Sequence, residues 1–384
     1  MPTSTNSKSF SPPEFREACA AGSVSEVKIA LTRNAALAKD WKPLLDACYG
    51  GHPGVVDLLL KAGADANVRS PNSHKHRPLV RTTEWKKTAK KHEGHIEVVR
   101  LLLKGGADPS LAGGLYGWRP LAHAAMCGDV GLVSAIRRDR RSSAGVGLHF
   151  AAMLYDEDGV SKLCSIDLAN TTDEGGRTPL HFLAASGMHG VLGSNIALRI
   201  ATQLIREGAD VNASHAHPLR TEQPATPLWW AVAWHGHTAL AKCFLENGAN
   251  PNSAVHAASS EGYDQVLRLL IEHGADLNHL IDGQTALHQM MVFKRPRLVP
   301  LLLESGANPN IGDQAGNTAL HLAAQSGVRL TVVETLLSYG ADRRQCNAEN
   351  RTAYDLARER GLDELANMLI ASRRMAPIRT SLRT

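Results

Sequence analysis

Apolar and polar positions along the chain recur with a period of about 33 residues. The clearest copy, residues 317–342, reads NTALHLAAQSGVRLTVVETLLSYGAD. Within it, Leu320, Ala323 and Ala324 follow one another at helical spacing. Thr318 precedes them and is a suitable N-cap. The pattern therefore predicts a short helix whose small residues allow the equivalent helix of a neighbouring copy to approach closely.

A second helix is predicted in the same copy. Gly327 ends the first helix, and Gly340 follows the second one as a left-handed C-cap. Between them, four apolar residues form one stripe of a helix: Val332, Val333, Leu336 and Leu337. A unit this short cannot close a core alone, so we expect it to stack on further copies of itself.

The repeat extends over nearly the whole chain. Its stop signal, G-A-D or G-A-N, begins at Gly63, Gly106, Gly208, Gly248, Gly274, Gly306 and Gly340. The apolar anchor of its first helix can be placed at Phe15, Leu44, Leu79, Leu121, Leu148, Leu180, Leu228, Val255, Leu287, Leu320 and Tyr354. These anchors predict ten or eleven units, of which those headed by Phe15 and Leu148 match the pattern least.

The recurring motifs resemble the ankyrin repeat. TPLH at 178–181, TALH at 285–288 and 318–321, and GADVN at 208–212 carry the resemblance. It implies an all-α repeat solenoid of stacked helix-turn-helix units joined by short β-hairpin loops. It also implies a non-catalytic scaffold, inhibitor or adaptor, which binds a protein through the hairpin tips and first-helix faces of the concave side.

Two polar residue types recur within the repeat. We expect the histidines to connect neighbouring units through loop backbone; they are His149, His181, His256, His288 and His321. The asparagines that follow the stop signal suit turns; they are Asn67, Asn212, Asn252, Asn278 and Asn310. The family resemblance adds that such asparagines can be hydroxylated.

The repeat also sets the expected domain organisation. We expect residues 1–12 to be a disordered polar tail and residues 13–372 to form one solenoid, with an irregular joint near 136–175. Residues 373–384 carry arginines and no acid, and we expect a flexible basic tail.

Composition limits the classes of partner and the cellular compartments that we expect for this protein. The formal net charge of +5 is modest for 384 residues and does not by itself indicate nucleic-acid binding. The six cysteines are widely spaced, so they form no short metal or disulfide motif and favour a reducing compartment. We see neither a signal peptide nor a membrane span and expect a cytoplasmic or nuclear location, or both. The partner and the oligomeric state stay open.

The first departure from the repeat is an insertion in the third unit. It carries basic residues and one aromatic residue, namely Arg81, Trp85, Lys86, Lys87, Lys90 and Lys91. It is interpreted as a solvated loop or longer helix, or as a basic segment over 81–95 that binds an acidic peptide, a phosphate group or a nucleic-acid backbone. Four nearby histidines leave a zinc site as a weaker alternative: His74, His76, His92 and His95. We expect no metal and no cofactor.

Two further departures supply candidates. Trp230 and Trp234 lie four residues apart and can share one helix face, partly in the core and partly as a binding hot spot. Residues 186–210 contain an insertion between the two helices of one unit. An unusual enzyme with a site in the insertions at 74–95 and 187–195 is therefore a further alternative. No nucleotide-binding, nucleophile-elbow or zinc-protease motif accompanies it.

Overall fold

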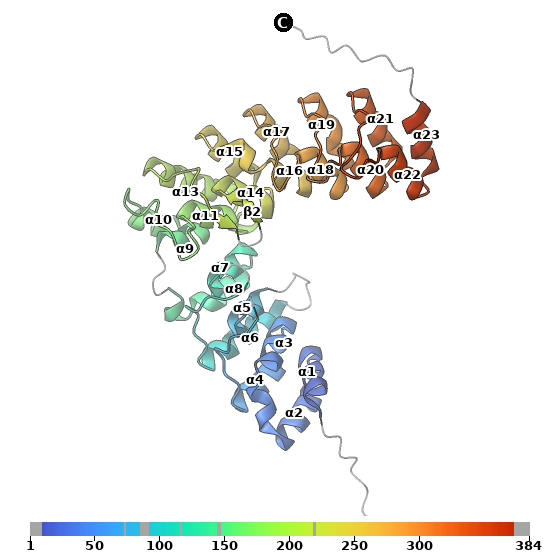
Figure 1. The fold of residues 1–384 in the computed structure, drawn as a ribbon. Coiled ribbons are helices and arrows are strands. Elements are labelled where there is room, and N and C mark those ends of the chain that lie inside the picture. Colours follow the sequence, from blue (N-terminus) through green and yellow to red (C-terminus); the bar gives the residue numbers. More distant parts are fainter. Residues whose placement is uncertain are drawn as a thin grey trace, which may run out of the picture. The chain divides into compact units, whose positions relative to one another are not determined.

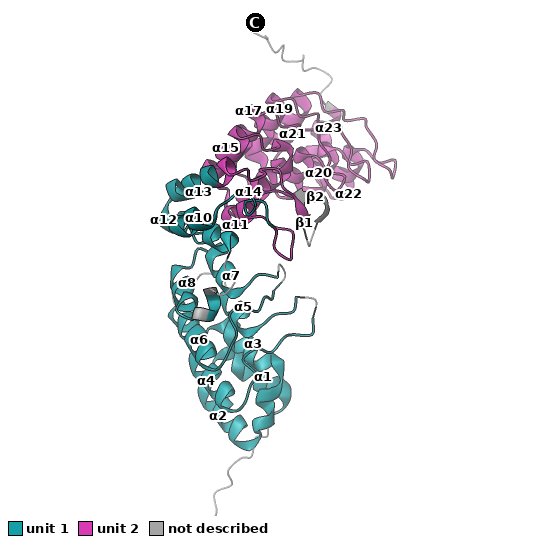
Figure 2. Ribbon diagram, turned by 90° about the vertical axis from the view of Figure 1, so that its left-hand side faces the viewer, with its two compact units in different colours: residues 1–171, 186–203 teal, residues 172–185, 204–384 magenta. Residues whose placement is uncertain are grey.

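The computed structural model describes residues 10–72, 74–84, 92–114, 117–143, 147–217 and 220–371. Within these ranges almost all of the regular secondary structure is helical (Figure 1). The helices divide into two compact units, residues 1–171 with 186–203 and residues 172–185 with 204–384 (Figure 2). Each unit is a stack of helix pairs.

Unit 1 begins with four complete pairs and continues through the short helices α9, α10 and α12 and most of α13. Its elements are α1 (Pro12–Ala21), α2 (Val24–Arg33), η1 (Ala35–Lys39), α3 (Trp41–Gly50), α4 (Pro53–Lys61), α5 (Pro78–Thr83), α6 (His92–Lys104), α7 (Pro120–Met126), α8 (Val130–Arg137), η2 (Arg140–Ser143), α9 (Leu148–Met153), α10 (Glu157–Leu163), α12 (His189–Leu192) and most of α13 (Ser194–Arg206). Figure 2 shows α1, α3, α5 and α7 in one row and α2, α4, α6 and α8 in another.

Unit 2 continues the same alternation. Its elements are α11 (Pro179–Ala185), β1 (His215–His217), β2 (Arg220–Ala225), α14 (Pro227–His235), α15 (Thr238–Glu246), η3 (Pro251–Ser253), α16 (Val255–Glu261), α17 (Asp264–Glu272), α18 (Ala286–Val292), η4 (Pro296–Leu298), α19 (Val299–Glu304), α20 (Ala319–Ser326), α21 (Leu330–Ser338), α22 (Ala353–Glu359) and α23 (Asp363–Ala371). In Figure 1, α15, α17, α19 and α21 form one row, and α16, α18, α20 and α22 form the other.

The predicted anchors lie where the pattern put them. Every one of them falls in the first helix of a pair, from Phe15 in α1 to Tyr354 in α22. All are buried except Tyr354, which is half-buried. The prediction of ten or eleven stacked units is therefore confirmed as an all-α solenoid, with eleven first helices among the described residues.

The best-matched copy folds as its pattern predicts. Thr318 is the N-cap of α20, and Gly327 ends that helix with φ of 62°, in the left-handed region that favours glycine. In α21, Val332, Val333 and Leu336 are buried and Leu337 is half-buried. This apolar stripe packs the second helix onto its own first helix and its neighbours.

The linkers between pairs contain little regular strand. Among the described residues, one antiparallel pair of strands occurs, in which His215 of β1 lies opposite Ala225 of β2. Single bridges join Gly113 to Trp118 and Ile281 to Gln284. None of the helices that the structure describes has the length and apolar composition needed to cross a membrane.

Candidate binding surface

The repeat histidines connect each helix-pair repeat to the repeat that follows it within the same compact unit. In α20, the His321 ring accepts a hydrogen bond at Nδ1 from the Thr318 backbone (3.1 Å), so its Nε2–H is left to donate to the Arg351 carbonyl (3.0 Å). The other four repeat histidines place Nε2 at 2.7–3.0 Å from a carbonyl oxygen of the following linker: His149, His181, His256 and His288. The predicted structural role of these histidines is confirmed.

Burial keeps several of these rings neutral. It lowers the pKa of His181 to about 3, with His215 as the next cause, and it lowers the pKa of His288 and His321. A neutral ring can accept at one nitrogen and donate at the other, which this arrangement requires. Because both nitrogens are already hydrogen-bonded, these rings are poorly suited to act as general bases.

The asparagines after the stop signal also connect successive repeats. The interpretation of these asparagines as turn residues, made from the sequence, did not include this role. Asn310 donates from Nδ2 to the Gly340 carbonyl (2.9 Å) and accepts from the Asp342 backbone N–H (2.7 Å). Asn67, Asn212 and Asn278 make the same two hydrogen bonds, each to the stop signal of the repeat that follows its own. The recurrence of Asn at one register position is the signal that could have indicated this ladder.

A row of charged and aromatic side chains lies on the first helices of unit 1. Arg16 of α1 forms an ion pair with Asp46 of α3, and the Arg81 guanidinium of α5 lies over the Tyr49 ring of α3 at 4.0 Å from its centroid. Arg81 also pairs with Glu84, which follows α5 (2.9 Å). We call these five residues, Arg16, Asp46, Tyr49, Arg81 and Glu84, the first-helix face.

The first-helix face contributes little to the core. Tyr49 is 42% exposed and the Arg16 side chain 48% exposed. Exposed ion pairs and a cation–π contact of this kind are each worth about 0.5–1 kcal/mol. Tyr49 is a large aromatic group presented to solvent, and Arg81, whose side chain is 28% exposed, lies over its ring; such a pair is typical of residues that bind a partner.

Local electrostatics hold the row in place. Hydrogen bonding to Asp46 raises the pKa of the Arg16 guanidinium. The His76 Nδ1–H donates to Glu84 (3.0 Å), and burial lowers the pKa of His76 even though Glu84 opposes that shift. Glu84 therefore sits between Arg81 and His76, which orients Arg81 over Tyr49.

Of the predicted partner-binding residues in the insertion 81–95, Arg81 lies in this row. Trp85, Lys86, Lys87, Lys90 and Lys91 fall outside the described residues. Sequence reasoning missed the other four members of the row. The signal was their register, since Asp46 with Tyr49 and Arg81 with Glu84 stand two and five residues after the anchors Leu44 and Leu79.

The two tryptophans are stacked, and only one reaches the surface. Their rings are 5.8 Å apart at an interplanar angle of 7°. Trp230 is fully buried, and its Nε1–H donates to His215 Nε2 of β1 (2.9 Å). Trp234 is half-buried. The structure thus assigns Trp230 to the core, and only Trp234 can contribute to a surface.

The four candidate zinc ligands are dispersed among different partners. His74 and His76 lie edge to face with ring centroids 5.4 Å apart. His95 is completely buried and donates from Nε2 to the Tyr49 carbonyl (3.0 Å). The His92 side chain lies outside the described residues. The described part of the chain contains no group of three or more His, Cys, Asp or Glu residues arranged to hold a metal ion.

The insertion after α11 packs onto α7. The Gly187 N–H donates to the Ala125 carbonyl (3.0 Å), and α12 follows directly. On the other side of α7, Cys127 Sγ lies 3.8 Å from the Thr83 carbonyl oxygen and 3.8 Å from His123 Nδ1. The distance between the thiol and the imidazole is at the long end of a hydrogen bond that involves sulfur.

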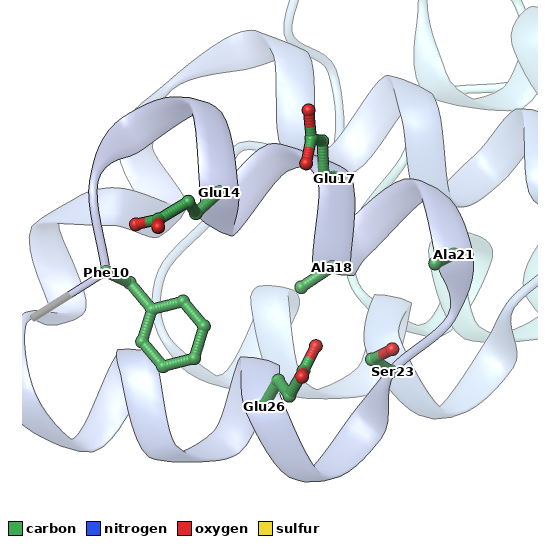
Figure 3. Close-up of a pocket in the computed structure, with 7 residues that line it drawn as sticks. All are labelled: Phe10, Glu14, Glu17, Ala18, Ala21, Ser23 and Glu26. Atoms are coloured by element: carbon green, nitrogen blue, oxygen red, sulfur yellow. The ribbon is translucent and has the colours of Figure 1, made fainter. Parts of the chain in front are cut away.

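A shallow hollow of about 260 Å³ opens between α1 and α2 at the start of unit 1 (Figure 3). Phe10, Ala18 and Ala21 form its apolar part, and three carboxylates border it, those of Glu14, Glu17 and Glu26. Glu14 is also half of a capping box with Ser11. The lining residues follow α1 and the start of α2, and none of them belongs to the first-helix face.

Comparison with known proteins identifies the repeat. The family described as "Ankyrin repeats (3 copies)" matches in overlapping segments from residue 148 to residue 378, and "Ankyrin repeat" matches 39–71 and 88–113. The chain belongs to the ankyrin-repeat family. Ankyrin repeats are generally modules of protein–protein interaction, so the family agrees with a surface that binds another protein.

Several curated proteins are similar over parts of the chain. Mouse cyclin-dependent kinase 4 inhibitor B is 34% identical over 126 residues, which are 33% of this chain and 96% of that protein. The chicken nuclear factor NF-kappa-B p105 subunit is 30% identical over 219 residues, 53% of this chain and 21% of that protein. A Caenorhabditis elegans homolog of transient receptor potential cation channel subfamily A member 1 is 35% identical over 122 residues, 31% of this chain and 10% of that protein.

The chain therefore spans about a tenth of the length of the channel homolog and about a fifth of the length of the p105 subunit. Among solved structures, the human ASB11 ankyrin repeat domain aligns with a TM-score of 0.47 at 24% identity, covering 60% of this chain and 99% of that one.

Proposed function

We propose that this ankyrin-repeat chain is a non-catalytic adaptor or scaffold that binds a protein partner through the first-helix face of unit 1 and the adjoining hairpin tips. The observation that carries the proposal is the stack of the half-buried Arg81 on the exposed Tyr49, oriented by Glu84. Aromatic and arginine side chains at the centre of a contact account for most hot spots in protein interfaces.

Other contacts already hold the repeats together, so folding does not require the Tyr49 and Arg81 side chains. This supports a role for them in binding. The histidine and asparagine ladders and the buried anchors already connect the units, and they lie elsewhere in the repeat. None of the six cysteines, which all lie in the described ranges, forms a disulfide, in agreement with the reducing compartment proposed for this protein, the cytoplasm, the nucleus or both.

The experiment is quantitative affinity capture with two matched double variants. Tyr49→Ser with Arg81→Ser removes the stack, whereas Lys61→Ser with Arg100→Ser removes two exposed side chains from the second helices α4 and α6. We expect the first variant to lose at least tenfold in partner recovery, which corresponds to about 1.4 kcal/mol, and the control to retain it. Equal recovery by both variants would refute the proposed surface.

Binding of an anionic ligand or a nucleic acid through the basic insertion 81–95 is the second candidate. Arg81 is the one residue of that insertion's basic set that the structure describes, and it is half-buried beside Tyr49. This function requires affinity that falls steeply as salt rises, because released counterions dominate such binding. A protein partner held by the Tyr49–Arg81 stack would show a shallower salt dependence.

A further inference from the structure

A cavity of about 270 Å³ lies inside unit 1, between the pair α7/α8 and the pair α9/α10. Its walls include Leu121 of α7, Ala151 of α9 and Leu154 after α9, all three buried. Leu163 at the end of α10 borders it and is partly exposed. The cavity thus combines an aliphatic interior with access from solvent.

The sequence of α10 departs from that of other second helices at a residue that lines the cavity. In α4, α8, α15, α17 and α21, the third residue after the N-cap is a buried or nearly buried valine or leucine that fills the space beside the helix. These residues are Val55, Leu132, Leu240, Val266 and Val332. In α10 the corresponding residue is Gly159, and Val160 is the only buried residue of that helix. A Cβ at Gly159 would lie 3.2 Å from the Ala151 Cβ and 3.0 Å from Asp156 Cγ, so the glycine allows α10 to approach α9 closely at the border of the cavity.

Two opposite charges border the same cavity. Arg137 ends α8 and Asp156 is the N-cap of α10, and the distance between Arg137 Nη2 and Asp156 Oδ2 is 3.8 Å. That distance is longer than a hydrogen bond, so neither group is saturated by the other. Asp156 Oδ1 accepts the Gly159 N–H (3.0 Å), which holds the carboxylate at the cavity.

We propose that this cavity binds a small aliphatic α-amino acid as its zwitterion. The aliphatic side chain lies in the cavity against Leu121 and Leu154. The ligand carboxylate accepts hydrogen bonds from Arg137, and its ammonium group donates to Asp156. The site is independent of the first-helix face, so either proposal can fail without the other.

Charge complementarity selects this ligand over simpler amphipathic ones. A carboxylate without an amine gains Arg137 and is repelled by Asp156, and an amine without a carboxylate has the opposite problem. An apolar molecule without either group fills the interior and leaves both charges facing it. At about 270 Å³ the cavity is also smaller than the 300–1,000 Å³ common for drug-sized ligands, which fits a molecule the size of leucine.

The test is an NMR titration of the full chain with three probes of the same carbon skeleton: L-leucine, 4-methylpentanoate and 3-methylbutylamine. We expect saturable shifts with L-leucine, at an affinity at least tenfold higher than that of either analogue. Absence of saturable L-leucine binding, or equal affinity for all three probes, would overturn the proposal.

Variants of the charged pair identify the site. Arg137→Gln and Asp156→Asn should each weaken L-leucine binding at least tenfold; the asparagine keeps the oxygen that caps α10. Arg138→Gln, the exposed neighbour at the same helix end, is the matched control and should leave the affinity unchanged. An equal loss in the Arg138 and Arg137 variants would contradict the assignment.

Filling the cavity gives an independent readout. Gly159→Val should abolish L-leucine binding, although its Cβ would lie 3.0 Å from Asp156 Cγ and 3.2 Å from the Ala151 Cβ, so the neighbours must shift. Circular dichroism establishes whether this variant folds. Binding retained by a folded Gly159→Val variant refutes the site, and if the variant does not fold, the charge variants decide.

Discussion

At the scale of single residues, the histidine after the apolar anchor links two parts of the chain that the repeat brings together. In His321 the same ring caps its own helix through Thr318 and reaches the next linker at Arg351. Because the ring is completely buried, a missing partner cannot be replaced by water. Sequence spacing predicted this role, since the motif itself recurs in register with the anchor.

Replacing His321 should therefore destabilise the protein measurably. We expect His321→Ala to lower the free energy of unfolding by about 1–3 kcal/mol, the cost of leaving buried polar groups without partners. The measurement is urea unfolding, with His279→Ala in an exposed linker position as the control. A change no larger than that of the control would show that the ladder does not stabilise the stack.

Acid should weaken the stack through the same residue type. An unfolded histidine has a pKa near 6.5, whereas burial lowers the pKa of His181 to about 3. Above pH 6.5 both states are neutral and the contribution is complete. As the pH falls from 6.5 toward 3, the unfolded chain binds protons that His181 does not, so stability decreases by up to about 1.4 kcal/mol per pH unit for this group.

The pH dependence is measured as the urea midpoint at pH 7, 6 and 5. We expect a decline in the wild type and a shallower decline in His181→Gln, because His288 and His321 still contribute. Midpoints that do not change with pH, or identical slopes in the two proteins, would contradict the neutral-ring assignment.

At the scale of helices, the units differ in how much apolar surface their second helix buries. α21 buries Val332, Val333 and Leu336, whereas α10 buries Val160 alone. The sequence pattern identified the unit of Leu148 as a poor match to the repeat. It could not show the cavity beside Gly159, which depends on how α8 and α10 pack against the first helices.

This difference predicts unequal costs for equivalent substitutions. Both Leu320 and Leu148 are buried anchors. We expect Leu320→Ala to cost about 2–5 kcal/mol, as is typical of a leucine in a well-packed core, and Leu148→Ala to cost less. Chemical denaturation measures both. Equal losses would mean that the unit of α9 and α10 is as well packed as the others.

The lysine-rich insertion is also an element of its own, and its role stays a prediction. Replacing Lys86, Lys87, Lys90 and Lys91 together with Ala should change stability only slightly, within about 0.5 kcal/mol per site, because the repeat does not need these residues. It should weaken an acidic partner, with an effect that fades as salt screens the charges. A variant with unchanged affinity and salt response for every partner would leave the insertion without a binding role.

At the scale of the whole molecule, the fold was predictable and most of the binding surface was not. Periodic anchors such as Leu320 identify the solenoid because each unit repeats the same burial. The contact between Tyr49 and Arg81 joins residues of two successive repeats in unit 1, so neither position alone indicates it. Trp230 shows the converse, because its i, i+4 spacing with Trp234 could not reveal that β1 would cover one ring and leave the other half-exposed.

The most direct test of the proposed function is site-specific photo-cross-linking from the first-helix face. A photoreactive phenylalanine analogue replaces Tyr49, and in a matched protein it replaces Tyr339, which has similar exposure at the end of the second helix α21. We predict covalent capture of a discrete protein from position 49 and little or none from position 339. Equal capture at both positions, or capture from position 339 alone, would contradict binding through the first-helix face.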